Sequence, residues 1–295
     1  MEQALIKPEW LKVKLSAKDE FHSVKQSIKA NGLHTVCEEA HCPNISECWN
    51  SGTATFMLMG DVCTRSCKFC AVKSGNPKKA LDADEPRKLA KSIAEISLFD
   101  YVVLTSVTRD DLEDGGASHF AECIREVKKA YPSIIIEVLI PDFRGNIDSL
   151  KMIADAHPEV IAHNIETVER LQRKARDIRA NYSQSLGVLR NAKEIGSPYT
   201  KSSIMLGIGE EDKEVIKAME DLRNVNVDFL TIGQYMRPSS WHLPIKEYVR
   251  PEKFEYFRRK GLEMGFLYVA SGPFVRSSYK AGENFVKSAL KKLYK

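Results

Sequence analysis

The sequence has no long hydrophobic run and no strong excess of either charge. No stretch of about 18 consecutive apolar residues occurs, so a membrane-spanning helix is not expected. The N-terminus, MEQALIKPEWLKVKL, lacks the continuous apolar core of a secretory signal. The 44 basic and 40 acidic residues leave a net charge of +4, which gives no support for nucleic-acid binding. We therefore expect a soluble, cytoplasmic protein that binds neither membranes nor nucleic acid.

Cysteine is almost absent outside one short region. Six of the seven cysteines lie between residues 37 and 70, and such clustering of soft thiolates is typical of a metal site. A reducing compartment keeps these thiols free, so disulfides are not expected. The seventh, Cys123, lies in a predicted helix, and we interpret it as a small buried hydrophobic residue.

The downstream group of cysteines has the pattern CxxxCxxC, formed by Cys63, Cys67 and Cys70, with Phe69 directly before the last one. Three thiolates on one tight loop hold three irons of a cubane iron–sulfur cluster, and no fourth cysteine lies nearby. The fourth iron then stays open and is able to chelate a small molecule. The alternatives are a structural zinc site, which needs four ligands, and simple burial of apolar cysteines.

This pattern resembles the signature of the radical S-adenosylmethionine (SAM) enzymes. In that family the open iron binds the amino and carboxylate groups of SAM, and an electron from the cluster cleaves SAM to methionine and a 5′-deoxyadenosyl radical. The resemblance therefore implies two cofactors at this loop, a [4Fe-4S] cluster held by the three cysteines and SAM.

The upstream group of cysteines makes the resemblance more specific. Cys37, Cys42 and Cys48 form CxxxxCxxxxxC, and this set followed by CxxxCxxC closely resembles the lipoyl synthase family. Further stretches resemble that family's motifs in order along the chain: 7–11, 110–117, 141–145, 163–168, 233–235 and 272–279. Biotin synthase is the nearest rival, but the upstream cysteines and the Arg-Ser-Ser-Tyr motif at 276–279 fit lipoyl synthase.

The resemblance implies a second [4Fe-4S] cluster, held by Cys37, Cys42, Cys48 and a serine of the C-terminal motif. We expect Ser278 to be this ligand, with Ser277 as the alternative, and a Ser-Ser pair capping a helix at 279–293 as the other interpretation. An alkoxide is a less usual iron ligand than a thiolate, so that iron is expected to be the one released. The implied reaction inserts two sulfur atoms, taken from this auxiliary cluster, at C6 and C8 of a protein-bound octanoyl chain.

The resemblance also implies the partners. The substrate is an octanoylated lysine on a carrier domain, such as the acyltransferase subunit of a 2-oxoacid dehydrogenase complex or the glycine-cleavage H protein. The reductant is a ferredoxin or flavodoxin. Because no side-chain base removes a proton from an unactivated methylene group, we expect the cofactors to perform the chemistry, without a catalytic His–Asp pair.

Two other classes of protein remain as alternatives at this stage. A non-catalytic iron–sulfur protein that transfers electrons or senses redox state is distinguished by its failure to cleave SAM under a strong reductant. A zinc-stabilised binding module is distinguished by colour, because zinc proteins lack the brown absorbance of iron–sulfur clusters.

From residue 54 the sequence alternates strands and helices. Short apolar runs predict buried parallel strands at 54–59, 101–105, 134–140, 160–163, 202–206, 228–232 and 266–270. Helices are predicted at 19–30, 86–98, 117–130, 147–156, 182–195 and 212–223. Repeated βα units predict an α/β fold, either an open sheet or a barrel. The resemblance implies a partial (β/α)6 TIM-like barrel over 54–270, with extensions over 1–53 and 271–295 that carry the auxiliary cysteines and the serine ligand.

Polar residues follow the predicted strands, where barrel enzymes carry their chemistry. The resemblance implies that Thr105, Asn164 and Glu166 bind SAM, whereas turn and capping roles are the alternative. Arg179 is the candidate for the SAM carboxylate, against a solvated charge in the basic stretch 173–179. Two aromatic residues either contact the adenine or pack in the core: Phe69 and Tyr235.

Overall fold

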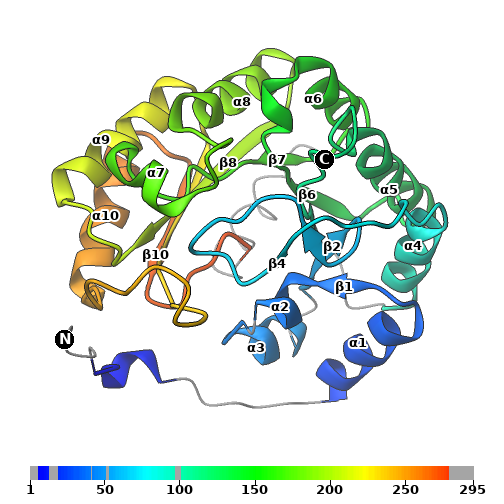
Figure 1. Ribbon diagram of the computed structural model, residues 1–295, viewed down its shortest axis with the longest axis horizontal. Coiled ribbons are helices and arrows are strands. Elements are labelled where there is room, and N and C mark those ends of the chain that lie inside the picture. Colours follow the sequence, from blue (N-terminus) through cyan, green and yellow to red (C-terminus); the bar gives the residue numbers. More distant parts are fainter. Residues whose placement is uncertain (1–5, 13–18, 41, 51–52, 97–100, 279–295) are drawn as a thin grey trace.

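The sheet of this protein curves into a barrel that is open on one side. The computed structural model describes residues 6–12, 19–40, 42–50, 53–96 and 101–278. Within them an eight-stranded sheet surrounds a central space, and helices cover its outer surface (Figure 1). Its order is β1-β2-β5-β6-β7-β8-β9-β10, and only the β1–β2 pairing is antiparallel. Since the edge strands β1 and β10 do not pair with each other, the expected partial barrel is confirmed.

The barrel consists of six strand–helix units and a final strand. The parallel strands are β2 (Thr55–Leu58), β5 (Tyr101–Ser106), β6 (Ile135–Leu139), β7 (Val160–Ala162), β8 (Tyr199–Leu206), β9 (Phe229–Gln234) and β10 (Tyr268–Gly272). The helices between them are α4 (Glu85–Glu95), α5 (Ala117–Ala130), α6 (Ile147–Ala154), α8 (Tyr182–Glu194), α9 (Asp212–Asn224) and α10 (Pro251–Glu263). Before them come α1 (Asp19–Ala30), β1 (His34–Thr35), α2 (Val36–Glu39) and α3 (Ile45–Asn50). Within the described residues, none of the helices is both long and apolar enough to span a bilayer.

Alternation along each strand separates the outer core from the barrel interior. In β5, Val102 and Leu104 pack in the cluster of apolar residues beneath the helices, whereas Tyr101 and Val103 belong to a separate interior cluster. Thr105, the next residue of the same phase, lines a cavity above that cluster. The interior is therefore closed below by packed side chains and hollow at the carboxyl ends of the strands.

A buried ion pair crosses the closed part of the interior. Lys201 Nζ on β8 lies 2.9 and 2.8 Å from the two carboxylate oxygens of Glu137 on β6, and Tyr101 also donates a hydrogen bond to this carboxylate. Lys201 and Glu137 are 4% and 1% exposed. Strand β8 begins at Tyr199, before the predicted start at 202. Its first residues are polar, so they did not look like a buried strand in the sequence, although this end of the strand borders the packed interior.

Several elements were not predicted from the sequence. They include β1, helix α10, and the short parallel pair β3 (Val62–Cys63) and β4 (Lys73–Ser74). Helix α10 buries only Phe254, Phe257 and Gly261 among many charged residues, so its apolar stripe is weak in the sequence. The expected helix at 279–293 lies outside the described residues.

Candidate active site

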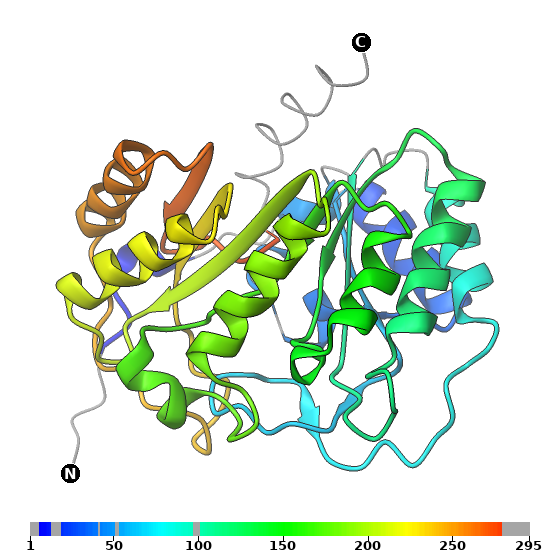
Figure 2. The ribbon, with the colours of Figure 1, turned by 90° about the horizontal axis from the view of Figure 1, so that it is seen from above.

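The loop with Cys63, Cys67 and Cys70 begins directly after β2 and crosses the mouth of the barrel (Figure 2). The chain turns at Met59 and Gly60, whose φ angles are 68° and 92°. Glu85 fixes this turn, because its two carboxylate oxygens accept the Met59 N–H at 3.1 and 3.0 Å. His119 Nε2 lies 2.6 Å from the same carboxylate. The start of the cysteine loop is thus held by α4 and α5.

The three thiols of this loop have surroundings that suit metal-bound thiolates. Cys63 Sγ accepts the N–H groups of Arg65 and Thr108, each at 3.4 Å, and Cys67 Sγ accepts that of Asp177 at 3.3 Å. Burial raises the pKa of Cys67 to about 11 and that of Cys70 to about 12. Without metal these two thiols hold their protons, and cluster binding must displace them. The donors aimed at sulfur favour the thiolate form that a cluster requires.

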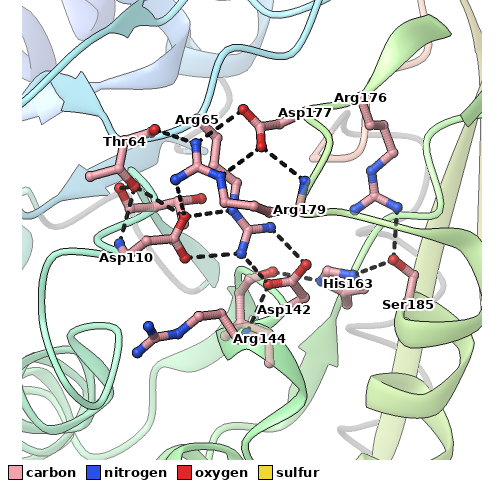
Figure 3. Close-up of polar contacts among 12 residues, drawn as sticks. Thr64, Arg65, Asp110, Asp142, Arg144, His163, Arg176, Asp177, Arg179 and Ser185 are labelled. Atoms are coloured by element: carbon pink, nitrogen blue, oxygen red, sulfur yellow. Dashed lines mark hydrogen bonds and ion pairs between the residues drawn. The ribbon is translucent and has the colours of Figure 1, made fainter. Parts of the chain in front are cut away.

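A charged network fastens the cysteine loop to the neighbouring strand ends (Figure 3). The Arg65 guanidinium binds Asp142 through two hydrogen bonds of 2.7 Å and Asp110 through two of 2.9 and 3.0 Å. Burial opposes ionisation of Asp142, but the hydrogen bonds and charge of Arg65 outweigh it and lower its pKa to about 2. Arg65 thereby joins the loop to the residues that follow β5 and β6.

Replacing Arg65 with methionine removes the cation between two buried carboxylates. We expect the free energy of unfolding to fall by about 3–5 kcal/mol, since Asp142 keeps a buried charge without a partner. Thermal unfolding with quantified iron checks this, and the exposed Arg144→Met is the matched control. A variant as stable as the parent would show that the network does not hold the loop.

Arg179 does not face the cavity, contrary to its expected contact with the SAM carboxylate. Its guanidinium binds Asp177 at 2.8 and 3.1 Å, the Thr64 carbonyl at 2.7 Å and Asp110 at 3.2 Å. These hydrogen bonds hold the pKa of Asp177 well below its usual range. Arg179 is absent from the cavity wall, whereas the nearby Arg176 forms part of it.

A cavity of about 310 Å³ lies between the cysteine loop and the strand ends. Its wall contains most of the expected site residues and the serine pair: Cys63, Cys67, Phe69, Cys70, Thr105, Asn164, Glu166, Arg176, Ser277 and Ser278. The buried Ser106 Oγ and Asn164 Oδ1 find no hydrogen-bond partner among the residues that the structure describes. Buried polar atoms of this kind require a polar ligand, so the cavity suits a molecule rich in hydroxyl, amino and carboxylate groups such as SAM.

Glu166 is held rigidly at the edge of this cavity. Its φ angle is 67°, and its backbone exchanges hydrogen bonds with Ser203 and Met205 on β8. Asn164 Nδ2 donates to Glu166 Oε1 at 3.2 Å. Burial raises the pKa of Glu166, and the charge of Arg176 and the Asn164 hydrogen bond act in the opposite direction. The carboxyl group is thus positioned as a hydrogen-bonding group, with no basic residue in direct contact.

His163 also lines the cavity, but its ring nitrogens are occupied. Nδ1 lies 2.9 Å from the Ile140 carbonyl, which only accepts, so Nδ1 carries the proton. Nε2 then accepts from Ser185 Oγ at 2.9 Å, and Ser185 in turn accepts from Arg176 at 2.7 Å. Burial and the charge of Arg176 lower the His163 pKa to about 4. His163 is therefore a neutral structural group that helps to fix Arg176.

The second set of cysteines lies in a small adjoining pocket of about 20 Å³. Its wall contains Cys37, Cys42, Cys48, Arg276 and Ser278, but not Ser277. Burial, reinforced by the nearby Cys42, raises the pKa of Cys37 to about 11. Among the described residues no cysteine forms a disulfide. Three thiols and one hydroxyl converge here, so this donor set suits a cluster with a serine ligand, and the geometry favours Ser278.

The C-terminal end of the described chain packs against residues 44 and 55 at this pocket. Thr55 Oγ1 donates to Ser278 Oγ at 2.8 Å, and Asn44 Nδ2 donates to the Phe274 carbonyl at 2.6 Å. A Cβ atom on Gly233 would lie 2.0 Å from the Val275 carbonyl oxygen, so only glycine lets this segment approach β9. The segment 274–278 is thereby held against α3, β2 and β9.

A chamber of about 270 Å³ connects the two cysteine sets. Its wall contains Cys37 and Cys42 of the upstream set and Cys70 of the loop, together with Tyr235 and Ser278. Tyr235 is 2% exposed, and its hydroxyl donates to the Leu243 carbonyl at 2.9 Å. Thiols of both cysteine sets therefore border the same cavity.

The sequence did not single out one further cluster of ligand-type residues. Glu85, His119 and Cys123 place one ligand atom each within 4.8 Å of one another. Cys123 is fully buried, as expected, and its pKa is raised chiefly by burial. Within this cluster Glu85 binds the Met59 N–H with both oxygens and lies beside His119, so we assign these two residues to anchoring the cysteine loop, whereas Cys123 is a buried apolar neighbour. Only the tertiary fold reveals the cluster, because its residues come from different helices.

The fold defines the class of protein. Methylornithine synthase has a TM-score of 0.56 and 15% identity, over 95% of this chain and 89% of that one. The FeFe-hydrogenase maturase HydG from Carboxydothermus hydrogenoformans has a TM-score of 0.54 and 13% identity, over 94% and 72% of the two chains. The family model of the Radical SAM superfamily matches residues 57–222, which include all three cysteines of the loop. The chain is a radical SAM enzyme.

More specific similarity covers almost the whole chain. The family model for the N-terminal domain of lipoyl synthase matches residues 2–42. The lipoyl synthases of Anaeromyxobacter dehalogenans and Halobacterium salinarum are 55% and 57% identical, covering 96% and 97% of this chain and 96% and 93% of their own lengths. The apicoplast lipoyl synthase of Plasmodium knowlesi is 56% identical over 96% of this chain, which spans 64% of that longer relative. The chain belongs to the lipoyl synthase family.

Proposed function

We propose that this enzyme inserts two sulfur atoms, at C6 and C8, into an octanoyl chain attached to a lysine of a carrier domain. The observation that carries the proposal is the single chamber onto which both cysteine sets open. A reaction that joins a SAM-derived radical to a sulfur donor requires these two centres to border one shared space. Exclusion of water from that space protects a carbon radical from side reactions.

We assign the cluster ligands as two sets: Cys63, Cys67 and Cys70 for the SAM-binding [4Fe-4S] cluster, and Cys37, Cys42, Cys48 and Ser278 for the auxiliary one. When bound, these clusters supply the electron that cleaves SAM and the sulfide that is inserted. The contribution of the chain is to hold the two thiol sets at fixed positions beside the shared chamber. Thr55 orients the Ser278 hydroxyl through its hydrogen bond.

We assign SAM to the cavity beside the cysteine loop. Thr105, Asn164 and Glu166 offer polar groups for the amino acid moiety and the ribose, and the partnerless Asn164 Oδ1 supports this placement. Phe69 and Tyr235 offer rings for the adenine, since both line the connecting chamber. For the SAM carboxylate we propose Arg176 in place of Arg179, because the guanidinium of Arg179 is already held by Asp177 and Asp110.

The assignment of Arg176 predicts a defect in SAM binding. In Arg176→Met we expect the KM for SAM to rise roughly tenfold to a hundredfold, the loss of one charge-assisted hydrogen-bonded contact. Deoxyadenosine formation at varied SAM concentration checks this, and Arg176→Lys, which keeps the charge, should lie in between. An unchanged KM in Arg176→Met would remove Arg176 from the SAM site.

The proposal also covers the partners of the enzyme, the division of its chain into parts and its cellular compartment. We propose an octanoylated carrier domain as substrate, from a 2-oxoacid dehydrogenase complex or a glycine-cleavage H protein, and a ferredoxin or flavodoxin as reductant. We divide the chain into an N-terminal extension (1–53), the barrel (54–270) and a C-terminal extension (271–295). Free thiols and cluster assembly suit the reducing cytoplasm.

A single-turnover assay tests the proposed function. Anaerobically reconstituted protein, with iron and sulfide quantified, receives an octanoyl-lysine peptide, SAM and dithionite. We expect 5′-deoxyadenosine together with a thiolated octanoyl product. Deoxyadenosine without thiolated product would contradict the octanoyl substrate, and neither product from protein with both clusters intact would contradict the reaction itself.

A further inference from the structure

Large apolar and basic side chains are exposed around the cysteine loop. We call this surface the cluster-loop face and define it by six residues: Lys68, Arg173, Lys174, Ile178, Arg237 and Trp241. Ile178 is 77% exposed and Trp241 52% exposed, the highest values among the large hydrophobic residues of the described chain apart from Ile6. An exposed aromatic ring among cations is typical of the centre of a protein-binding surface.

Three segments that are distant in sequence meet at this face. The Lys68 N–H donates to the Ala175 carbonyl at 2.8 Å, which joins the cysteine loop to helix α7 (Gln172–Ala175). The Lys68 carbonyl accepts the Leu243 N–H at 2.9 Å, which joins the same loop to the segment after β9. In Figure 2, α7, the cysteine loop and the loop after β9 lie along the same edge of the molecule.

The charge of the face is positive. Lys68 Nζ lies 3.4 Å from the centre of the Trp241 ring, and Arg237 Nε donates to the His242 carbonyl at 3.0 Å. Within the described residues neither of these cations, nor the exposed Arg173 and Lys174, forms an ion pair. The neighbouring carboxylates do not offset them: the side chains of Asp110 and Asp177 are 11% and 6% exposed and are held by Arg65 and Arg179. Charge complementarity therefore selects an acidic partner.

A short series of contacts connects this face to Cys70, a proposed cluster ligand. The rings of Trp241 and His242 are 5.0 Å apart between centroids. His242 Nε2 lies 2.8 Å from the Cys70 carbonyl, and because a carbonyl only accepts, this nitrogen donates. Lys68 itself stands next to Cys67 in the chain. A partner on this face therefore lies close to the thiols of Cys67 and Cys70, where an electron has the least distance to cross.

We propose that the cluster-loop face docks an acidic one-electron carrier protein of the flavodoxin or ferredoxin type, which reduces the iron–sulfur cluster of the cysteine loop. The inference rests on the proposed function, since reductive cleavage of SAM requires such a donor. One electron leaves the reduced cofactor of the carrier, which is oxidised by one electron, and the cluster is reduced by one. No covalent bond forms or breaks in this transfer.

Charge reversal away from the cluster ligands tests the docking. We expect Lys174→Glu/Arg237→Glu to weaken the Kd for a flavodoxin, titrated at low ionic strength, by roughly tenfold or more. The Kd of the parent should also rise with salt more steeply than that of the variant. Trp241→Ala, which removes the exposed ring and leaves the charges, should weaken binding without changing the salt dependence. Lys25→Glu, an exposed reversal on α1, is the matched control.

A comparison of two reductants distinguishes a loss of docking from damage to the cluster. With an octanoyl-lysine peptide as substrate, the double variant should form deoxyadenosine at the parent rate with dithionite but more slowly with reduced flavodoxin. An unchanged Kd and flavodoxin-driven rate would overturn the docking proposal. The docking proposal would also be overturned if the double variant kept its flavodoxin-driven rate but had a raised KM for an octanoylated carrier domain. That result would assign the face to the substrate. If the parent fails to cleave SAM with dithionite, the proposed function fails, whereas the Kd still reports the docking.

Discussion

Replacement of Cys67 with alanine is expected to abolish SAM cleavage. Cys67 is the central thiol of its loop, and its sulfur accepts the Asp177 N–H at 3.3 Å. Its loss leaves two thiolates, Cys63 and Cys70, for a cluster that already lacks a fourth protein ligand. Without a cluster at this position no electron reaches SAM. The measurement is 5′-deoxyadenosine formed under dithionite, with iron content determined on the same sample.

Cys123→Ala is the control for this experiment. Cys123 is fully buried on α5 and lies outside both cysteine sets, so its loss removes a thiol without touching a proposed ligand. We expect this variant to retain deoxyadenosine formation. Formation of deoxyadenosine by Cys67→Ala at a rate near that of the parent would show that the loop does not hold the SAM-binding cluster.

Replacement of Cys42 with alanine is expected to separate the two halves of the reaction. Cys42 lines the small pocket and the connecting chamber, but neither it nor Cys37 lines the cavity assigned to SAM. The SAM-binding thiols and the Arg65 network are therefore left intact. SAM cleavage should remain measurable, whereas the thiolated octanoyl product should be lost, because the sulfur donor is no longer held by three thiolates.

The two products are measured in the same single-turnover reaction. Glu39→Ala is the matched control, because Glu39 lies between Cys37 and Cys42, is half-exposed, and makes only a long contact of 3.6 Å with His34. We expect it to form both products. A lipoyl product from Cys42→Ala would make the assignment of the upstream cysteines to the sulfur donor wrong.

The sequence predicted the residues whose position follows from local order. Cys63, Cys67 and Cys70 lie on one loop directly after a strand, so their convergence at the barrel mouth required only the order of elements. Thr105 lies near the carboxyl end of β5 and Asn164 follows β7, and the carboxyl ends of parallel strands share one edge of the sheet. That edge forms the cavity wall in the structure.

The orientation of the basic residues in the stretch 173–179 could not be predicted from the sequence. Arg176 turns inward because Ser185 on α8 accepts a hydrogen bond from its guanidinium, and Arg179 turns away because Asp177 and Asp110 bind it. Asp177 is a local partner, two residues from Arg179, but Ser185 and Asp110 lie outside this stretch, and only the tertiary fold brings them to the two arginines. The same holds for the contact of Glu85 with Met59, which joins the start of α4 to the end of β2.

The hydrogen bond between Thr55 and Ser278 joins residues that are 223 positions apart. Contacts at such separation form late in folding, since the chain between them must first be ordered. The Ser278 hydroxyl therefore joins the pocket of Cys37, Cys42 and Cys48 only after the barrel is complete. The SAM-binding loop depends on no contact with Ser278, so the two centres can mature one after the other. A chain that stops before residue 278 keeps the elements that hold the SAM-binding cysteine loop, but it lacks the hydroxyl that lines the pocket of the upstream cysteines.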